Sequence, residues 1–305
     1  AAKTDNMLQY EYARSALKLG LQLGKKTGAN PYKFGMIGAS DTHTALSTTR
    51  EENYFGKYKS AEPGPDRHNT EVVPAQDPSL RIFASQEVAS GLTVVWARDN
   101  TRGEIFDAMK RKEVYATTGT RMRVRVFAGW DFEADEVMRP DFIAQGYQRG
   151  VPMGGDLRNA PKGKAPAIMV RALRDPDGAN LDRIQIIKGW LDAKGKTHER
   201  IYDVAVSGGR KIGADGRVKE QVGNTVDLAT ATYTNTIGAA LLGAHWVDPD
   251  FDPKQHAFYY VRVLEIPTPR WTTYDAAFFK IPLPDPVPAT IQDRAYTSPI
   301  WYSPR

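Results

Sequence analysis

The chain has 305 residues, with 41 basic and 36 acidic side chains, a formal net charge of +5 and no cysteine. This length suits two ordinary domains or one large one, and the lack of cysteine excludes disulfides, thiolate zinc sites and cysteine nucleophiles. The basic residues are scattered among acidic ones, which argues against nucleic-acid binding. The sequence has no run of about 18 apolar residues, so no membrane span is predicted.

The first part of the chain is predicted to alternate helix and strand. Apolar residues at near-helical spacing from Leu8 to Leu23 predict a helix that ends at Gly24, before a turn at Gly28–Pro31. The short apolar run Tyr32–Ile37 predicts a buried strand, and the polar cluster Ser40–His43 follows it directly. Folds of the α/β class place catalytic groups at the carboxyl ends of their strands, so this cluster is a candidate site.

The next elements continue this pattern. Residues 47–80 are rich in proline and polar residues and predict a long loop, which in a compact domain is usually functional or mobile. Leu92–Ala97 predicts a strand, and a helix capped by Asn100 or Thr101 is expected to run through Lys112. Val114–Gly119 predicts a further strand that ends in a turn.

After residue 120 the sequence favours β-structure. Apolar residues alternate with others over Met122–Ala128, which is a strand pattern. Many short strands separated by turns predict a β-sandwich-like domain over residues 121–305, after an α/β domain over residues 1–120. The further strands are expected at Ala167–Ala172, Arg183–Trp190, Glu199–Val206, Thr225–Tyr233, His256–Glu265 and Pro299–Tyr302.

Asp41-Thr42-His43 is the sharpest candidate for chemistry. In an extended backbone the side chains of Asp41 and His43 point to the same side, where a carboxylate and an imidazole can reach one metal ion or two adjacent ones. The alternative is an aspartate that caps a turn beside a surface histidine. A catalytic metal normally takes at least three protein ligands, and His68 is the one other histidine before the β-rich part. The spacing therefore suggests a metal site, but this part of the sequence offers too few ligand residues to complete it.

Three weaker patterns remain open. Glu51 and Glu52 could supply a ligand or a base, although a charged loop is the commoner meaning. Asp248–Asp252 has acidic spacing like that of a calcium loop but lacks the glycine and the distal glutamate of an EF-hand, so a plain turn is favoured. Aromatic residues could line a carbohydrate or protein surface in a non-catalytic β-sandwich binding module, with core packing as the favoured alternative. These residues are Trp190, Trp246, Trp271, Tyr259, Tyr260 and Trp301.

A family resemblance adds to this interpretation. Gly38–His43 resembles the final D-x-H metal-binding motif of the polymerase-and-histidinol-phosphatase (PHP) superfamily. More closely, the chain resembles the C-terminal half of PHP-like proteins grouped as domain-of-unknown-function family 3604. The stretches that carry this likeness are the helix from Asn6, Asn30–Gly35, Ser40–His43, Asn100–Arg102 with its helix, Glu113–Arg121 and Tyr296–Tyr302.

The resemblance implies a fold and an activity. It implies that residues 1–120 form the C-terminal portion of a distorted (β/α) PHP-type barrel, followed by the β-sandwich-like domain. It also implies two or three divalent metal ions (Zn, Mn or Fe) in the complete protein, with Asp41 and His43 among their ligands. The implied reaction is hydrolysis of a phosphoester, or a related ester or amide, by metal-activated water. The H-x-H motif that opens the superfamily is not in this sequence, so an N-terminal half of the same protein is an expected partner.

Four further expectations follow from the resemblance and the composition. Arg121 is the candidate to face a small anionic or ester substrate as a catalytic and binding group, with a surface or interdomain salt bridge as the alternative. Thr118 and Gly119 could donate hydrogen bonds to the same substrate group, and His68 could approach from its loop. Alone, the chain is expected to expose a sheet edge and to be stable only with its N-terminal half or as an oligomer, for which a homo-oligomer is one possibility. A periplasmic or secreted bacterial location is expected, with the cytoplasm left open.

Overall fold

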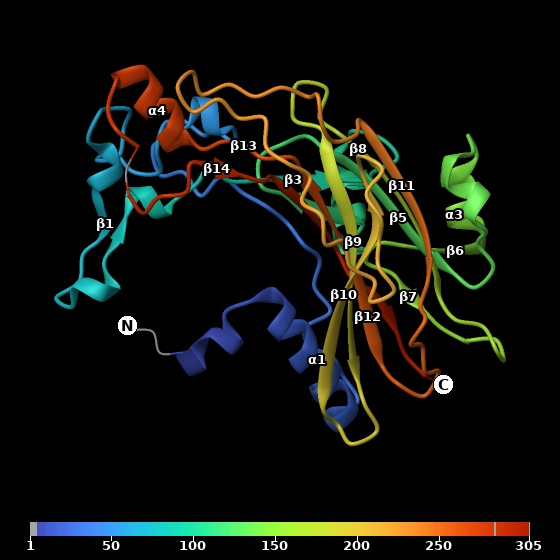
Figure 1. The fold of residues 1–305 in the computed structure, drawn as a ribbon. Helices are drawn as coiled ribbons and strands as arrows, with labels where there is room; N and C mark the ends of the chain where they lie inside the picture. The colour runs from blue at the N-terminus through green and yellow to red at the C-terminus, as the bar shows by residue number, and fades with distance from the viewer. Residues whose placement is uncertain (1–4, 284, 305) are drawn as a thin grey trace.

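Two largely antiparallel β-sheets pack face to face at the centre of the chain, whose residues 5–283 and 285–304 are described by a computed structural model (Figure 1). The larger sheet has the order β10 (Thr197–Val206), β9 (Leu181–Leu191), β12 (Ala257–Glu265), β15 (Arg294–Thr297), β4 (Val114–Thr117) and β3 (Leu92–Val95). In the same sheet, β16 (Ile300–Tyr302) pairs with β12 and with β7 (Asp156–Leu157). The smaller sheet has the order β11 (Leu241–Val247), β8 (Ala167–Leu173), β5 (Arg123–Gly129) and β6 (Gly150–Pro152).

Helices lie outside the two sheets, together with two small strand pairs. The α-helices are α1 (Ala13–Thr27), α2 (Arg102–Lys110), α3 (Phe142–Arg149) and α4 (Trp271–Phe279). The small pairs join β1 (Glu71–Val73) to β2 (Ile82–Phe83), and β13 (Thr268–Pro269) to β14 (Thr290–Ile291). Short 3-10 turns complete the described structure: η1 (Asp5–Tyr10), η2 (Glu51–Asn53), η3 (Arg67–Asn69), η4 (Pro78–Leu80), η5 (Ala84–Gln86) and η6 (Ala134–Met138).

Strand β12 is buried on both of its faces. Val261 and Val263 belong to the core that the two sheets share, whereas Phe258 and Tyr260 pack in a second cluster with Leu17 of α1. The alternation follows from the two-residue period of a strand. Each fully buried side chain of this size contributes roughly 1.5–3 kcal/mol, so burial on both faces makes β12 a central stabilising element.

The larger sheet joins the two predicted domains, residues 1–120 and 121–305. Strand β4 pairs with β15, and β3 pairs with β4, so the last strands of the first region extend the sheet that holds β12. Both pairings are antiparallel, unlike the parallel strands of a (β/α) barrel. No closed barrel is present among residues 5–283 and 285–304, and the architecture is mixed, rich in sheet and sandwich-like.

Several predicted elements are confirmed. Helix α2 begins after Thr101, whose hydroxyl accepts a hydrogen bond from the Glu104 amide at 3.3 Å as an N-cap. The alternation over Met122–Ala128 matches β5. The first predicted helix is present as α1, although it starts only at Ala13 and continues to Thr27, with Gly28 in the left-handed conformation at its end.

Two predicted strands are wrong. Tyr32–Ile37 has no strand structure. Within this segment the Met36 N–H donates a hydrogen bond to the Ser298 hydroxyl, at 2.9 Å from Oγ. Thr225–Tyr233 forms turns with a single bridge between Asp227 and Thr232, because the Asp227 carboxylate accepts hydrogen bonds from backbone amides just after it. In both segments, side chains satisfy backbone donors that a sheet ladder would otherwise pair.

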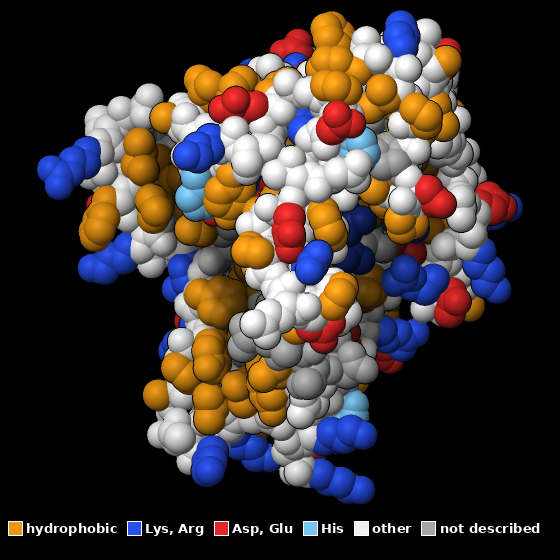
Figure 2. Space-filling view, turned by 90° about the vertical axis from the view of Figure 1, so that its left-hand side faces the viewer, with side chains coloured by type: hydrophobic (Ala, Val, Ile, Leu, Met, Phe, Trp, Pro, Cys, Tyr) orange, Lys and Arg blue, Asp and Glu red, His pale blue; other side chains and the backbone are white. Residues whose placement is uncertain are grey.

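A lobe projects from the sandwich and is called the α4 lobe here, comprising residues 47–90 and α4. Figure 1 shows it at the upper left, away from α1. Tyr54 and Ala89 pack against Trp271 in its small core, and Arg67 forms a two-point ion pair with Asp275 at 2.5 and 2.7 Å. Figure 2 shows basic and acidic side chains interspersed over the face that carries this lobe.

The acidic segment Asp248–Asp252 forms a turn around a buried ion pair. Asp248 is fully buried and lies 2.7 Å from Lys188 Nζ, and it also accepts a hydrogen bond from the Tyr259 hydroxyl at 2.6 Å. The Asp250 carboxylate accepts hydrogen bonds from Arg200 and Tyr202. Asp248 and Asp250 are thus used within the fold, and the segment forms the turn that the plain-turn interpretation predicts.

We expect Asp248→Ala to lower the free energy of unfolding by about 3–5 kcal/mol, because it leaves the Lys188 ammonium buried without its partner. Urea unfolding followed by tryptophan fluorescence measures the change. The double variant Lys188→Met/Asp248→Asn leaves no buried charge and should lose clearly less stability. If the double variant loses as much as Asp248→Ala, the unpaired charge is not the cause.

Candidate functional site

Asp41 and His43 lie on an irregular loop between α1 and β3. Asp41 adopts a left-handed backbone with φ of 54°, so the extended geometry expected for the D-x-H motif is wrong. The loop is held by the His43 N–H, which donates to the Lys57 carbonyl at 2.8 Å, and by the His43 ring, which stacks on Tyr58 with centroids 4.6 Å apart. Both side chains remain exposed and available to a ligand.

Two residues that the sequence analysis missed lie around this pair. Lys57 is 9% exposed, and its Nζ lies 3.9 Å from the Asp41 carboxylate and donates to Ser90 Oγ at 2.8 Å. Glu87 accepts a hydrogen bond from the Tyr54 hydroxyl at 3.2 Å. Burial raises the pKa of Glu87, and the negative charge of Asp41 raises it further, against the opposing effect of Lys57. The loop thus gathers two carboxylates, an imidazole and an ammonium group.

The donor set fits a metal ion in type but not in number. A carboxylate and an imidazole suit Zn, Mn or Fe, and a catalytic site usually takes three protein ligands. Within residues 5–283 and 285–304, no group of three or more His, Asp or Glu side chains is arranged to hold a metal ion. Asp41 and His43 alone therefore do not complete a catalytic metal centre.

The other predicted site residues lie elsewhere. The Thr118 hydroxyl donates to Asp293 Oδ1 at 2.6 Å, so it is used within the fold. Gly119 has φ of 149°, and a Cβ there would meet the Thr49 carbonyl oxygen at 1.9 Å, so glycine permits a close backbone crossing. Arg121 is exposed and lines a separate hollow between β3 and α2.

His68 is half-buried in η3, which packs against η5. None of the contacts described for this part of the chain joins it to Asp41 or His43. Of the predicted site residues, Asp41 and His43 share one loop, and the others lie on separate segments. No sequence pattern indicates that Lys57 and Glu87 lie near this pair. The long irregular segment 47–90 has no periodic pattern from which the positions of its side chains can be predicted.

Glu51 joins α4 to the end of the segment 47–90 within the α4 lobe. It is 7% exposed, and its two carboxyl oxygens accept hydrogen bonds from the backbone N–H groups of Ala89 and Trp271, each at 2.7 Å. Burial raises the pKa of Glu51 to about 7, and the two amides only partly oppose this. Glu51 is therefore a structural junction whose ionisation changes near neutral pH.

Comparison with known proteins places the chain in a family. The model of the family described as "Protein of unknown function (DUF3604)" matches residues 1–304. The chain belongs to this family. Among curated proteins, none matches it.

The pKa of Glu51 gives the DUF3604 chain a testable dependence on pH. A carboxyl group whose folded pKa is raised from 4.5 to about 7 contributes most stability below its unfolded pKa, and this contribution is lost as pH rises through 7. The loss amounts to roughly 3 kcal/mol. Glu51→Gln lacks this titration but donates where an acceptor is needed, so it should be less stable than the native chain at pH 5.

The stability deficit of Glu51→Gln should shrink as pH rises from 5 to 8, because only the native residue pays for ionisation in a buried site. Thermal melts of both proteins at each pH measure the difference. Glu62→Gln, at an exposed position of the same lobe, is the control and should show no such trend. A deficit that stays constant across this range would contradict the assigned role of burial.

Proposed function

We propose that the protein is a PHP-like metal-dependent hydrolase and that this chain supplies Asp41 and His43 as metal ligands. The observation that carries the proposal is their shared exposed loop, where Lys57 lies behind Asp41 and Tyr58 supports the His43 ring. An imidazole held by stacking and a carboxylate held by an ammonium group are partly ordered before any ion binds, which favours binding. Membership of the DUF3604 family agrees with the resemblance but assigns no activity.

The shortage of ligands shapes this proposal. Glu87 is an additional carboxylate close enough to interact electrostatically with Asp41 and His43, and we propose that the remaining ligands come from an N-terminal half of the same protein. Two or three Zn, Mn or Fe ions would then be shared between the halves of a PHP-type barrel. A bound ion would supply an activated water molecule for hydrolysis. Within this chain, the role of Asp41 and His43 is to hold that ion.

The proposed substrate is a small phosphoester, or a related ester or amide. Lys57 is the positive group beside Asp41, whereas Arg121 lines a different hollow. Lys57 therefore replaces Arg121 in our proposal as the group that faces the anionic part of the substrate. Its position between Asp41 and Ser90 also means that it orients the Asp41 carboxylate.

The alternative, a non-catalytic β-sandwich binding module, finds less support. Trp271, Trp301, Tyr259 and Tyr260 are buried, and Trp190 and Trp246 pack partly buried against the shared core. Most of the surface of these aromatic side chains is packed within the fold, as the core-packing interpretation predicts. The metal-site proposal is therefore preferred.

The proposal extends to the location and the assembly of the protein. We propose a periplasmic or secreted protein that associates through its N-terminal half or as a homo-oligomer. In the part of the chain that the structure describes, every helix is too short or too polar to cross a membrane.

We expect Asp41→Ala and His43→Ala to remove bound metal and to lower hydrolysis by a hundredfold or more, on the order expected when a direct ligand is lost rather than a surrounding residue. The full-length protein from its complete reading frame is purified with Mn²⁺ or Zn²⁺. Metal content is measured by elemental analysis, and activity is measured with nitrophenyl phosphate, phosphodiester and acetate substrates.

Asp66→Ala is the matched control, because Asp66 is an exposed aspartate of the neighbouring α4 lobe. It should retain both metal and activity. The proposal is wrong if the full-length protein holds no stoichiometric metal, or if Asp41→Ala keeps the native metal content and hydrolyses every substrate at the native rate.

A further inference from the structure

A cavity of about 340 Å³ lies at the junction between the sandwich and the α4 lobe. Its walls come from segments far apart in the sequence: residues 49–52, the turn 177–179, the loop 231–233, the end of β12 and the first turns of α4. The volume lies within the range of roughly 300–1,000 Å³ that is usual for small-molecule sites. The cavity is separate from the exposed loop that carries Asp41 and His43.

The lining of this cavity is strongly acidic. Five carboxyl groups line it, and Arg50 is the one basic side chain among the described lining residues. Arg50 is already paired with one of these groups, Glu52, at 3.0 Å, and it is partly exposed. Carboxyl groups therefore far outnumber basic groups in the wall. The carboxyl groups belong to Glu51, Glu52, Asp177, Glu265 and Asp293.

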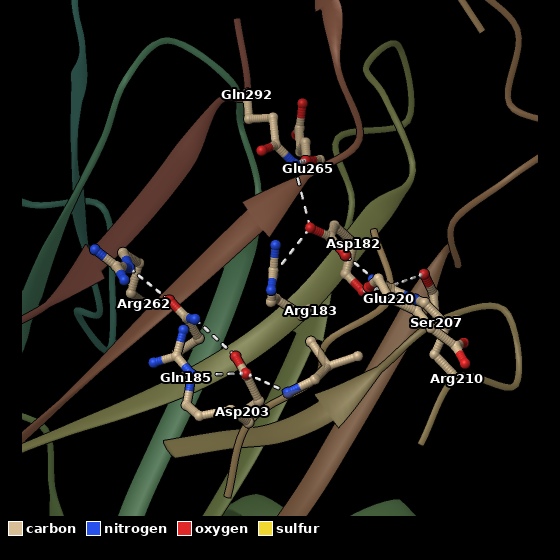
Figure 3. Close-up of polar contacts among 12 residues, drawn as sticks. Asp182, Arg183, Gln185, Asp203, Ser207, Arg210, Glu220, Arg262, Glu265 and Gln292 are labelled. Atoms are coloured by element: carbon tan, nitrogen blue, oxygen red, sulfur yellow. Dashed lines mark hydrogen bonds and ion pairs between the residues drawn. The ribbon is translucent and has the colours of Figure 1, made fainter. Parts of the chain in front are cut away.

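Glu265 provides an observation independent of this charge. It is 1% exposed at the end of β12, and neither of its carboxyl oxygens makes a hydrogen bond of acceptable geometry. Figure 3 shows it beside Gln292, which bonds the Glu265 backbone carbonyl at 2.8 Å and leaves the carboxyl group unbound. A buried carboxyl group without a partner is costly, so such a group indicates a missing ligand.

Protein groups nearby do not complete the partners of Glu265. The Thr120 hydroxyl and the Ala179 backbone N–H approach the carboxyl group, and each can donate one hydrogen bond at most. Burial raises the pKa of Glu265 well above its ordinary value, and the charge of Asp293 raises it further. A positive ligand would offset both effects. A carboxylate offers about four acceptor positions, so Glu265 keeps acceptor capacity for an outside donor.

The arrangement favours an organic cation over a bare metal ion. The carboxyl groups are spread around the wall, and no three of the described His, Asp or Glu side chains are arranged to hold an ion. Tyr233 and Tyr274 add aromatic surface to the wall, and aromatic rings attract ammonium groups. We propose that this cavity binds a small organic molecule with a primary ammonium group, which donates hydrogen bonds to Glu265 and Asp293.

This proposal does not depend on the proposed hydrolase activity. The amine site uses none of Asp41, His43, Lys57 or Glu87, so it can exist whether or not the protein binds metal. Asp41→Ala should leave amine binding unchanged. A failure of the metal proposal and a failure of this proposal are therefore distinguishable in one set of proteins.

Isothermal titration calorimetry of the full-length protein with putrescine (1,4-diaminobutane) tests the proposal. We expect saturable binding that Glu265→Gln weakens roughly tenfold or more, because it removes a charge-assisted hydrogen bond. Glu52→Gln, at an exposed position of the wall, should weaken binding without disturbing buried packing. Glu62→Gln is the matched control outside the cavity and should bind as the native protein does.

Two further titrations separate charge from shape. 1,4-Butanediol has the same chain length without charge and should not bind, and CaCl₂ should not displace putrescine. The proposal is overturned if putrescine does not bind, if butanediol binds equally well, if Ca²⁺ binds and putrescine does not, or if Glu265→Gln and Glu52→Gln both bind with native affinity. Thermal melts confirm that each variant is folded.

Discussion

Burial of both faces of β12 is the constraint on which the rest of the structure depends. One face of this strand completes the core between the two sheets, and the other receives α1. Because β12 is fixed on both sides, its neighbours are fixed with it. β15 and β4 continue the sheet toward the N-terminal region, and Glu265 at the end of the strand is held at the cavity wall. Both candidate sites are therefore positioned by the same framework.

The sequence predicts much of this framework, because the shared core is built from local patterns. The alternation over β5 and the Thr101 cap of α2 are signals confined to a few residues, and both are confirmed. The strand expected at Tyr32–Ile37 fails for a non-local reason: Ser298, from the other end of the chain, binds the backbone there. Apolar composition alone does not reveal such a competing partner.

The candidate sites are less predictable than the framework. The motif Asp41–His43 is visible in the sequence, but its left-handed backbone and its stacking on Tyr58 are not. Lys57 and Glu87 reach the pair from an irregular segment that has no period to read. The acidic cavity is harder still to predict. Its carboxyl groups come from segments far apart in the sequence and become neighbours only in the folded protein.

The junction at Glu51 has a consequence for the order in which the protein folds. Glu51 bonds to a residue 220 positions away, and the Arg67–Asp275 pair spans 208 positions. Closing such long loops is slow, and during synthesis the N-terminal part of the lobe waits for α4 to emerge. Until then, Tyr54 and Ala89 lack the indole of Trp271 that covers them. Residues 47–90 are therefore expected to reach their final structure late, as a segment that a chaperone or a protease meets before the lobe is closed.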